Sequence, residues 1–95
     1  YIKHENQSET NYIEEQQKAI IQALQLYQEK KRLGMEFLSQ CLGTVGDKIK
    51  YAVDIVNVPR QAVDNSAENQ CQDFREGKIQ NFIELDRNGN IVRIV

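Results

Sequence analysis

Residues 8–42 carry apolar side chains at the spacing of one long amphipathic helix, and this stretch constrains the fold most. Good helix formers such as Gln, Glu, Lys and Ala stand between the apolar positions. Those positions are Ile13, Ile20, Leu24, Tyr27, Met35, Leu38, Cys41 and Leu42. Unbroken, such a helix would be about 50 Å long, whereas a compact domain of this size has a radius of gyration near 13 Å. The helix must therefore project or break.

Gly34 is the expected point of a break. It follows three basic residues, and both cations and glycine are favourable at the C-terminal end of a helix. A projecting helix would expose an apolar stripe, which needs a partner such as a second copy of the chain. The candidate partner surface on this helix is formed by Ile13, Ile20, Leu24, Tyr27, Lys30, Lys31 and Arg32. The residues before the helix, 1–7, are predicted to be a disordered lead-in.

Residues 47–57 fit two kinds of structure. Val53 and Val56 continue a helical face from Ile49, whereas Ile49, Tyr51 and Val53 alternate as in a strand. The β-branched content favours a strand, but the Thr44–Asp47 spacing resembles a helix cap. We therefore interpret this stretch as helix or strand, with helix favoured.

Residues 59–76 are predicted to form a further helix. Pro59 suits a first helical turn, and Gly77 follows as a stop signal. The apolar seam has spacings of four, four and three residues and consists of Val63, Ala67, Cys71 and Phe74.

The C-terminal residues 79–95 change to a period of two and predict an antiparallel β-hairpin. Asn88-Gly89 is a strong two-residue turn signal. That register sets Leu85 against Val92, Ile83 against Ile94, Glu84 against Arg93, and Phe82 against Val95. The turn sequence Asp86–Asn90 is not a calcium loop of the EF-hand type, because its glycine is misplaced and its last ligand would fall beyond the chain. The hairpin is expected to pack on the helices.

Together these elements predict a single α+β domain over residues 1–95. The composition is ordinary for a globular protein, with 40% apolar residues, 27% charged residues and a net charge of −2. This charge argues against a nucleic-acid binder. The chain begins at Tyr1 and not at Met, so we expect a segment before it, and membrane contact only through such a missing segment.

Cys41 and Cys71 are a candidate disulfide, which would imply an oxidising compartment. The alternative is a pair of buried free thiols. Both cysteines lie on apolar faces of predicted helices, so one helix interface would bring their sulfur atoms together. We therefore expect an extracytoplasmic location, in the periplasm, at the cell surface or secreted, with the cytoplasm as the alternative.

Catalytic machinery and cofactor motifs are not recognisable in the sequence. The single histidine, His4, lies in the predicted lead-in, so the chain offers no buried base for Ser-His-Asp catalysis. The many carboxylates are interpreted as a solvated surface. They include Asp47, Asp54, Asp64, Asp73, Glu76, Glu84 and Asp86. We expect no enzyme activity, no cofactor and no metal site.

The predicted function is a non-enzymatic protein-interaction domain of a secreted, periplasmic or membrane-anchored protein, acting as an accessory, inhibitor or assembly subunit. One alternative is a cytoplasmic dimeric regulatory or adaptor module with free thiols. A long amphipathic helix over 8–42 that leads into a small antiparallel sheet over 79–95 also resembles pilin-like ectodomains. That resemblance implies an assembly subunit. The predicted helix at 59–76 departs from it, because pilin-type chains have a larger sheet.

Overall fold

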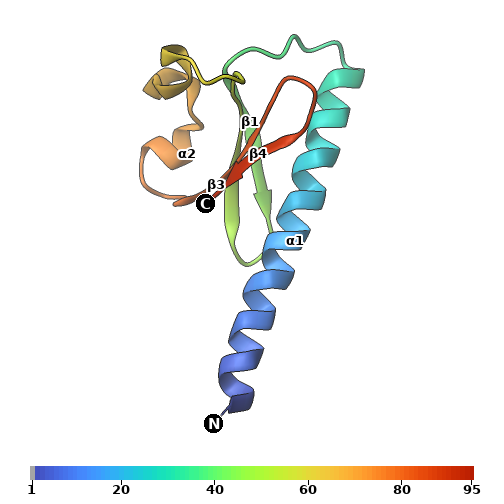
Figure 1. Ribbon diagram of the computed structural model, residues 1–95, viewed down its shortest axis with the longest axis vertical. Helices are drawn as coiled ribbons and strands as arrows, with labels where there is room; N and C mark the ends of the chain where they lie inside the picture. Colours follow the sequence, from blue (N-terminus) through green and yellow to red (C-terminus); the bar gives the residue numbers. More distant parts are fainter. Residues whose placement is uncertain (1) are drawn as a thin grey trace.

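The chain folds into one long helix packed against a four-stranded mixed sheet (Figure 1). The structure is a computed structural model that describes the backbone of residues 2–95 and the side chains of residues 11–95. The main elements are α1 (Ile2–Arg32), β1 (Gln40–Gly46), β2 (Lys50–Ile55), α2 (Gln72–Arg75), β3 (Asn81–Leu85) and β4 (Ile91–Ile94). The α+β class is thus confirmed.

The sheet has the strand order β1-β2-β3-β4 and is not purely antiparallel. Its two hairpins, β1–β2 and β3–β4, are each antiparallel, but β2 and β3 run parallel to one another. A parallel pair cannot be joined by a tight turn, so residues 56–80 form a crossover between these strands. The prediction of a sheet made only of the C-terminal hairpin was wrong.

Helix α1 begins at Ile2 and ends at Arg32, so its predicted limits of 8 and 42 were wrong. Residues 2–7 are helical and not a disordered lead-in; Tyr1 lies outside the described residues. The predicted break at Gly34 is confirmed. Gly34 adopts a φ of 85° and donates its N–H to the Lys31 carbonyl, and the Met35 N–H reaches the Lys30 carbonyl at 3.0 Å. This is a Schellman cap, which ends the helix and frees residues 40–46 to form β1.

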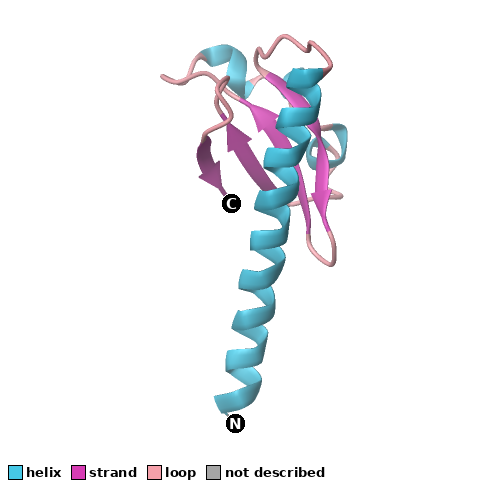
Figure 2. Cartoon of the chain, turned by 90° about the vertical axis from the view of Figure 1, so that its right-hand side faces the viewer, coloured by secondary structure: helices cyan, strands magenta, loops and turns pink. Residues whose placement is uncertain are grey.

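The main core lies between α1 and one face of the sheet. Ala19, Ala23 and Tyr27 are spaced four residues apart and are at most 2% exposed. The two alanines allow the helix to approach the strands closely, and Figure 2 shows α1 crossing this face of the sheet. The sheet contributes the buried side chains of Leu42, Tyr51, Val53, Ile55, Ile83 and Leu85.

Two polar side chains of α1 attach the helix to the turn between β1 and β2. Gln22 Oε1 accepts the Gly46 N–H at 2.7 Å, and Glu15 Oε1 accepts the Lys48 N–H at 2.9 Å. The Lys48 N–H is the main reason that the pKa of Glu15 lies below its ordinary value. Gln22 and Glu15 are seven residues apart, so both lie on the same side of the helix. They set the position of α1 along the hairpin.

The crossover covers the opposite face of the sheet. There Ala52, Cys71 and Ile79 are buried and form a second apolar cluster with Phe74 and Phe82. Strand β2 is therefore buried on both faces, from Tyr51 to Ile55. In such a strand the residues of both faces are mostly apolar, so 47–57 also fitted a helical face, and the resemblance of Thr44 and Asp47 to a helix cap then favoured helix. That preference was wrong.

The crossover does not contain the helix predicted over 59–76. It forms two short 3-10 turns, Ala62–Asn65 and Ala67–Asn69, followed by the single turn of α2. Asp64 explains the difference, because its side chain accepts the backbone N–H groups of Asn57 at 3.1 Å and Gln61 at 2.8 Å. Short polar side chains that bond nearby backbone groups compete with helix formation. The apolar seam was therefore misread as helical.

The C-terminal hairpin is present, with one change in register. Ile83 pairs with Ile94 and Glu84 with Arg93, as predicted, but Leu85 pairs with Ile91 after a bulge. Asp86 causes this change, because its carboxylate accepts N–H groups from both Asn88 and Asn90 and holds a longer loop. Val92, predicted to face Leu85 in the core, is instead 43% exposed.

Candidate functional site

Three charged side chains form a row across the sheet on the crossover face. Asp54 of β2 pairs with Glu84 of β3, and Glu84 pairs with Arg93 of β4. Residues paired across adjacent strands lie on the same face, about 5 Å from one strand to the next. Asp54 and Glu84 are 8% and 4% exposed, so the expectation that these carboxylates belong to a solvated surface was wrong.

Glu84 is neutralised by two arginines. Arg60, from the crossover, donates from Nη1 to Glu84 Oε2 at 3.1 Å, and Arg93 donates from Nε to Oε1 at 3.2 Å. The Arg93 guanidinium also lies 5.0 Å from the centre of the Phe82 ring. A buried carboxylate is tolerated when it is paired and hydrogen-bonded in this way.

Asp54 has no such partner. Among the described side chains, none donates a hydrogen bond to its carboxylate, and no cation lies within 4.0 Å of it. Burial and the nearby negative charge of Glu84 raise the pKa of Asp54 from 3.8 to about 6. The Cys71 N–H and the positive charge of Arg60 oppose this shift only in part. Asp54 is thus a buried acceptor whose hydrogen-bonding capacity is not met by other side chains.

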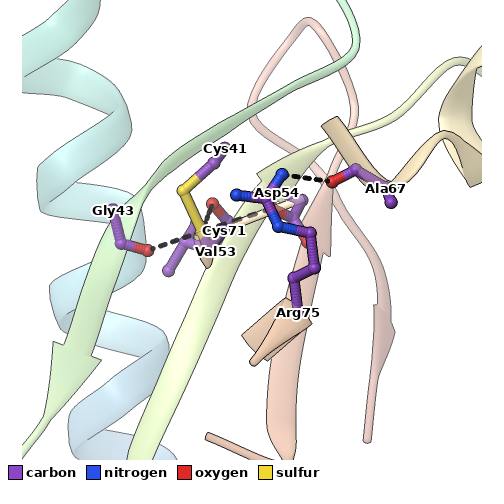
Figure 3. Close-up of a disulfide and its surroundings, with 7 residues drawn as sticks. All are labelled: Cys41, Gly43, Val53, Asp54, Ala67, Cys71 and Arg75. Atoms are coloured by element: carbon purple, nitrogen blue, oxygen red, sulfur yellow. Dashed lines mark hydrogen bonds between the residues drawn. A yellow bond between two sulfur atoms is a disulfide. The ribbon is translucent and has the colours of Figure 1, made fainter. Parts of the chain in front are cut away.

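The predicted disulfide between Cys41 and Cys71 is formed, and it lies beside Asp54 (Figure 3). The Cys71 sulfur is 3.4 Å from Asp54 Oδ1, a contact and not a proton donation, because a disulfide sulfur has no proton. The two cysteines do not meet at an interface between two helices, so that part of the prediction was wrong. Cys41 stands on β1 and Cys71 just before α2, so the bond ties the crossover to the edge of the sheet.

Among the described residues, Cys41, Asp54 and Cys71 also lie close enough together to be considered as a metal site. One ligand atom from each of Cys41, Asp54 and Cys71 lies within 4.8 Å of the others. Cysteine binds metal as a thiolate, however, and here the two sulfur atoms are bonded to each other. In the disulfide form, Asp54 is therefore the one charged ligand of the three.

A pocket of about 220 Å³ opens beside this row of charges, between the crossover and the sheet. Its charged lining is Asp54, Glu84, Arg60 and Arg93, and its apolar wall is formed by Phe74 and Phe82. The two rings meet edge to face with their centres 5.4 Å apart. The pocket therefore combines one unpaired carboxylate, two guanidinium groups and an aromatic wall.

The candidate partner surface on α1 is divided between core and solvent. Tyr27 lies in the core, where it stacks on Phe37 with the ring centres 4.5 Å apart. Ile20 and Leu24 pack partly against the core. Ile13 is 51% exposed, Lys30 is partly buried, and Lys31 and Arg32 are exposed.

An apolar groove on α1 was missed by the sequence analysis. Ile21 is 57% exposed and lines a shallow groove of about 400 Å³ with Leu24, Gln25 and Gln28. The eight-residue spacing between Ile13 and Ile21 could have indicated this groove, since residues eight apart lie on neighbouring sides of a helix. The pocket residues Asp54 and Glu84 carried no comparable signal, because they meet only through the parallel pairing of β2 and β3.

Comparisons of this chain with protein-family models, with curated proteins and with solved structures found no match. Within the described residues, none of the helices has the length and apolar character that crossing a membrane requires.

Proposed function

We propose that this chain is a non-enzymatic protein-interaction domain that acts outside the cytoplasm and binds its partner through α1. The observation that carries the proposal is an apolar strip along α1 that the sheet covers only in part. This strip consists of Ile13, Ile20, Ile21 and Leu24 and is called the lateral strip below. Its two outermost members, Ile13 and Ile21, are 51% and 57% exposed.

The lateral strip adjoins the part of α1 that packs on the sheet, and Ile20 and Leu24 at its border are partly buried. The helix residues buried against the sheet follow a spacing of four: Glu15, Ala19, Ala23 and Tyr27. Ile13, Ile20 and Leu24 follow spacings of seven and four and therefore share a neighbouring side of the helix. An apolar groove such as the one beside Ile21 is suited to an apolar side chain from a partner.

The disulfide supports an extracytoplasmic location within this proposal. Disulfides persist in secreted, periplasmic and cell-surface proteins and are rare in the cytosol. Cys71 is only 2% exposed and Cys41 is partly buried, so a reductant has access to the bond mainly from the Cys41 side. A count of free thiols in denatured, non-reduced protein taken directly from its source cells tests this part. Two free thiols per chain would favour the cytoplasmic, dimeric regulatory or adaptor module instead.

A pilin-like assembly subunit is the second candidate, and one observation favours it. The second half of α1 lies along a sheet while the first half extends beyond it (Figure 2), and residues 59–76 form no long helix. The helix predicted over 59–76, which departed from the pilin-like pattern, is therefore absent. In this form of the proposal, the partner of the lateral strip is a second copy of the chain.

Sedimentation velocity over a range of concentrations tests the self-association form of the proposal. Ile21→Asp is expected to weaken association at least tenfold, because it places a charge in the apolar contact. Asn11→Asp, which adds the same charge at an exposed position off the strip, should leave association unchanged. A wild-type chain that stays monomeric at every concentration would overturn this form.

A further inference from the structure

We propose that the pocket between the crossover and the sheet binds a small zwitterion of the α-amino acid type. Its ammonium group would lie against Asp54, and its carboxylate against the guanidinium groups of Arg60 and Arg93. The inference is independent of the function proposed for α1, because the pocket lies on the other face of the sheet from the helix.

At one end of the pocket, the Asp54 carboxylate can accept hydrogen bonds from a ligand. Asp54 is a buried residue, 8% exposed, and its carboxylate receives no hydrogen bond from any side chain among residues 11–95, so the Cys71 N–H is the donor that acts on it there. A buried acceptor left in this state costs free energy. An ammonium group supplies up to three donors and a positive charge. It would therefore bind where the protein has placed a carboxylate without its own cation.

The arginine end of the pocket retains unused donors. A guanidinium group has five N–H donors in a fixed plane. Arg93 uses Nε and Nη2 on Glu84, so its Nη1 group makes no hydrogen bond with the described residues. Arg60 uses Nε on Asn65, Nη1 on Glu84 and Nη2 on the Asp64 carbonyl, one bond from each nitrogen. Both arginines can therefore donate to a carboxylate without releasing Glu84.

The charge balance selects a ligand with no net charge. Two carboxylates and two guanidinium groups line the pocket, so their formal charges cancel. A simple amine or a simple carboxylic acid would add an unbalanced charge to this partly buried site, whereas a zwitterion would not. At about 220 Å³ the pocket is smaller than a site for a drug-sized ligand. Phe74 and Phe82 provide an apolar wall for a short hydrocarbon side chain.

Titration of the labelled protein with L-leucine, followed by two-dimensional amide NMR, tests the inference. We expect saturable shifts at the amides of Asp54, Glu84 and Phe82, and none at Ile21 on α1. Leucine amide, which lacks the carboxylate, and N-acetyl-leucine, which lacks the ammonium, should each bind at least tenfold more weakly. These analogues are used on the unmodified protein, so the test does not depend on a variant that folds.

A pair of variants assigns the ammonium contact. Asp54→Asn should weaken leucine binding at least tenfold, while Asp73→Asn, an exposed carboxylate on α2, should not change it. The inference is overturned if leucine causes no saturable shift, or if the shifts lie elsewhere. It is also overturned if leucine amide or N-acetyl-leucine binds as tightly as leucine.

Discussion

The ring of Tyr27 occupies the space that any side chain at position 89 would need. A Cβ atom added to Gly89 would lie 2.7 Å from Tyr27 Cε2, well inside van der Waals contact. The Tyr27 hydroxyl also donates a hydrogen bond to the Arg87 carbonyl at 2.7 Å. The loop between β3 and β4 is thus seated directly on α1, and the last hairpin is fixed to the first helix at this point.

Gly89→Ala is therefore expected to destabilise the protein strongly. Gly89 has a φ of +86°, which costs a residue with a Cβ about 1–2 kcal/mol, and the contact with Tyr27 adds a steric cost. Gly77→Ala is the matched control, because Gly77 has a φ of +78° but nothing within 4 Å of an added Cβ. Urea unfolding should show a loss for Gly89→Ala that exceeds the control by at least about 1 kcal/mol. Equal losses would mean that the loop does not rest on Tyr27.

The difference in stability between the Asp54→Asn variant and the wild type should depend on pH. The folded pKa of Asp54, about 6, lies above its ordinary value of 3.8, so its protonated form is favoured in the folded state. The stabilisation from that proton is complete below about pH 4 and is lost as the pH rises through 6. Asn carries no charge, so the variant should gain about 2 kcal/mol relative to wild type between pH 4 and pH 7.5.

Urea unfolding at several pH values measures this difference, with Asp73→Asn as the exposed control. The charged groups acting on Asp54 are Glu84 on β3 and Arg60 in the crossover. A stability difference that does not change between pH 4 and pH 7.5 would show that Asp54 is not perturbed by its surroundings.

Loss of the disulfide should have the same effect whichever cysteine is replaced. Cys41→Ser and Cys71→Ser are each expected to cost roughly 3–4 kcal/mol, because the bond closes a loop between residues 30 positions apart. The double variant should be no less stable than either single variant, since all three lack the same bond. Thermal or urea melts with additive losses would show that the two sulfur atoms act separately.

Asp64 is expected to stabilise the crossover through its two backbone hydrogen bonds. Although burial raises the pKa of Asp64, the N–H groups of Gln61 and Asn57 and the Ser39 hydroxyl lower it by more, so its net shift is downward. The stabilisation by its charged form is therefore present above the ordinary pKa and lost as the pH falls through the lowered value. Asp64→Asn should cost about 1–2 kcal/mol at pH 7 in urea unfolding. A loss at pH 7 no larger than that of Asp73→Asn would contradict this role.

Local signals in the sequence predicted several elements correctly. Gly34 after a basic run marked the end of α1, because a glycine with positive φ is the usual cap of a helix. The pairing of Glu84 with Arg93 followed from the alternation of the last strands. The disulfide was predicted as a pair although Cys41 was assigned to a helix that ends before it, at Arg32, and Cys71 to a helix that is not formed.

Features that depend on distant contacts were not predictable in this way. Strand β2 is buried on both faces, so apolar residues stand at most of its positions and its sequence fits a helical face as well as a strand. The pairing of Asp54 with Glu84 arises from strands 30 residues apart in the chain, joined by a crossover without a regular pattern. The lateral strip was only partly anticipated: Ile13, Ile20 and Leu24 were proposed, Ile21 was missed, and Tyr27 proved to be a core residue.

The position of the disulfide has a mechanical consequence. A load applied between the two ends of the chain would pass through α1, the sheet and β4. The bond from Cys41 to Cys71 bypasses β2 and most of the crossover, a segment of 30 residues. At about 3.3–3.6 Å per extended residue, roughly 100 Å of chain would be withheld from stretching even after the sheet had separated. The oxidised domain is therefore built to yield only a limited length under tension.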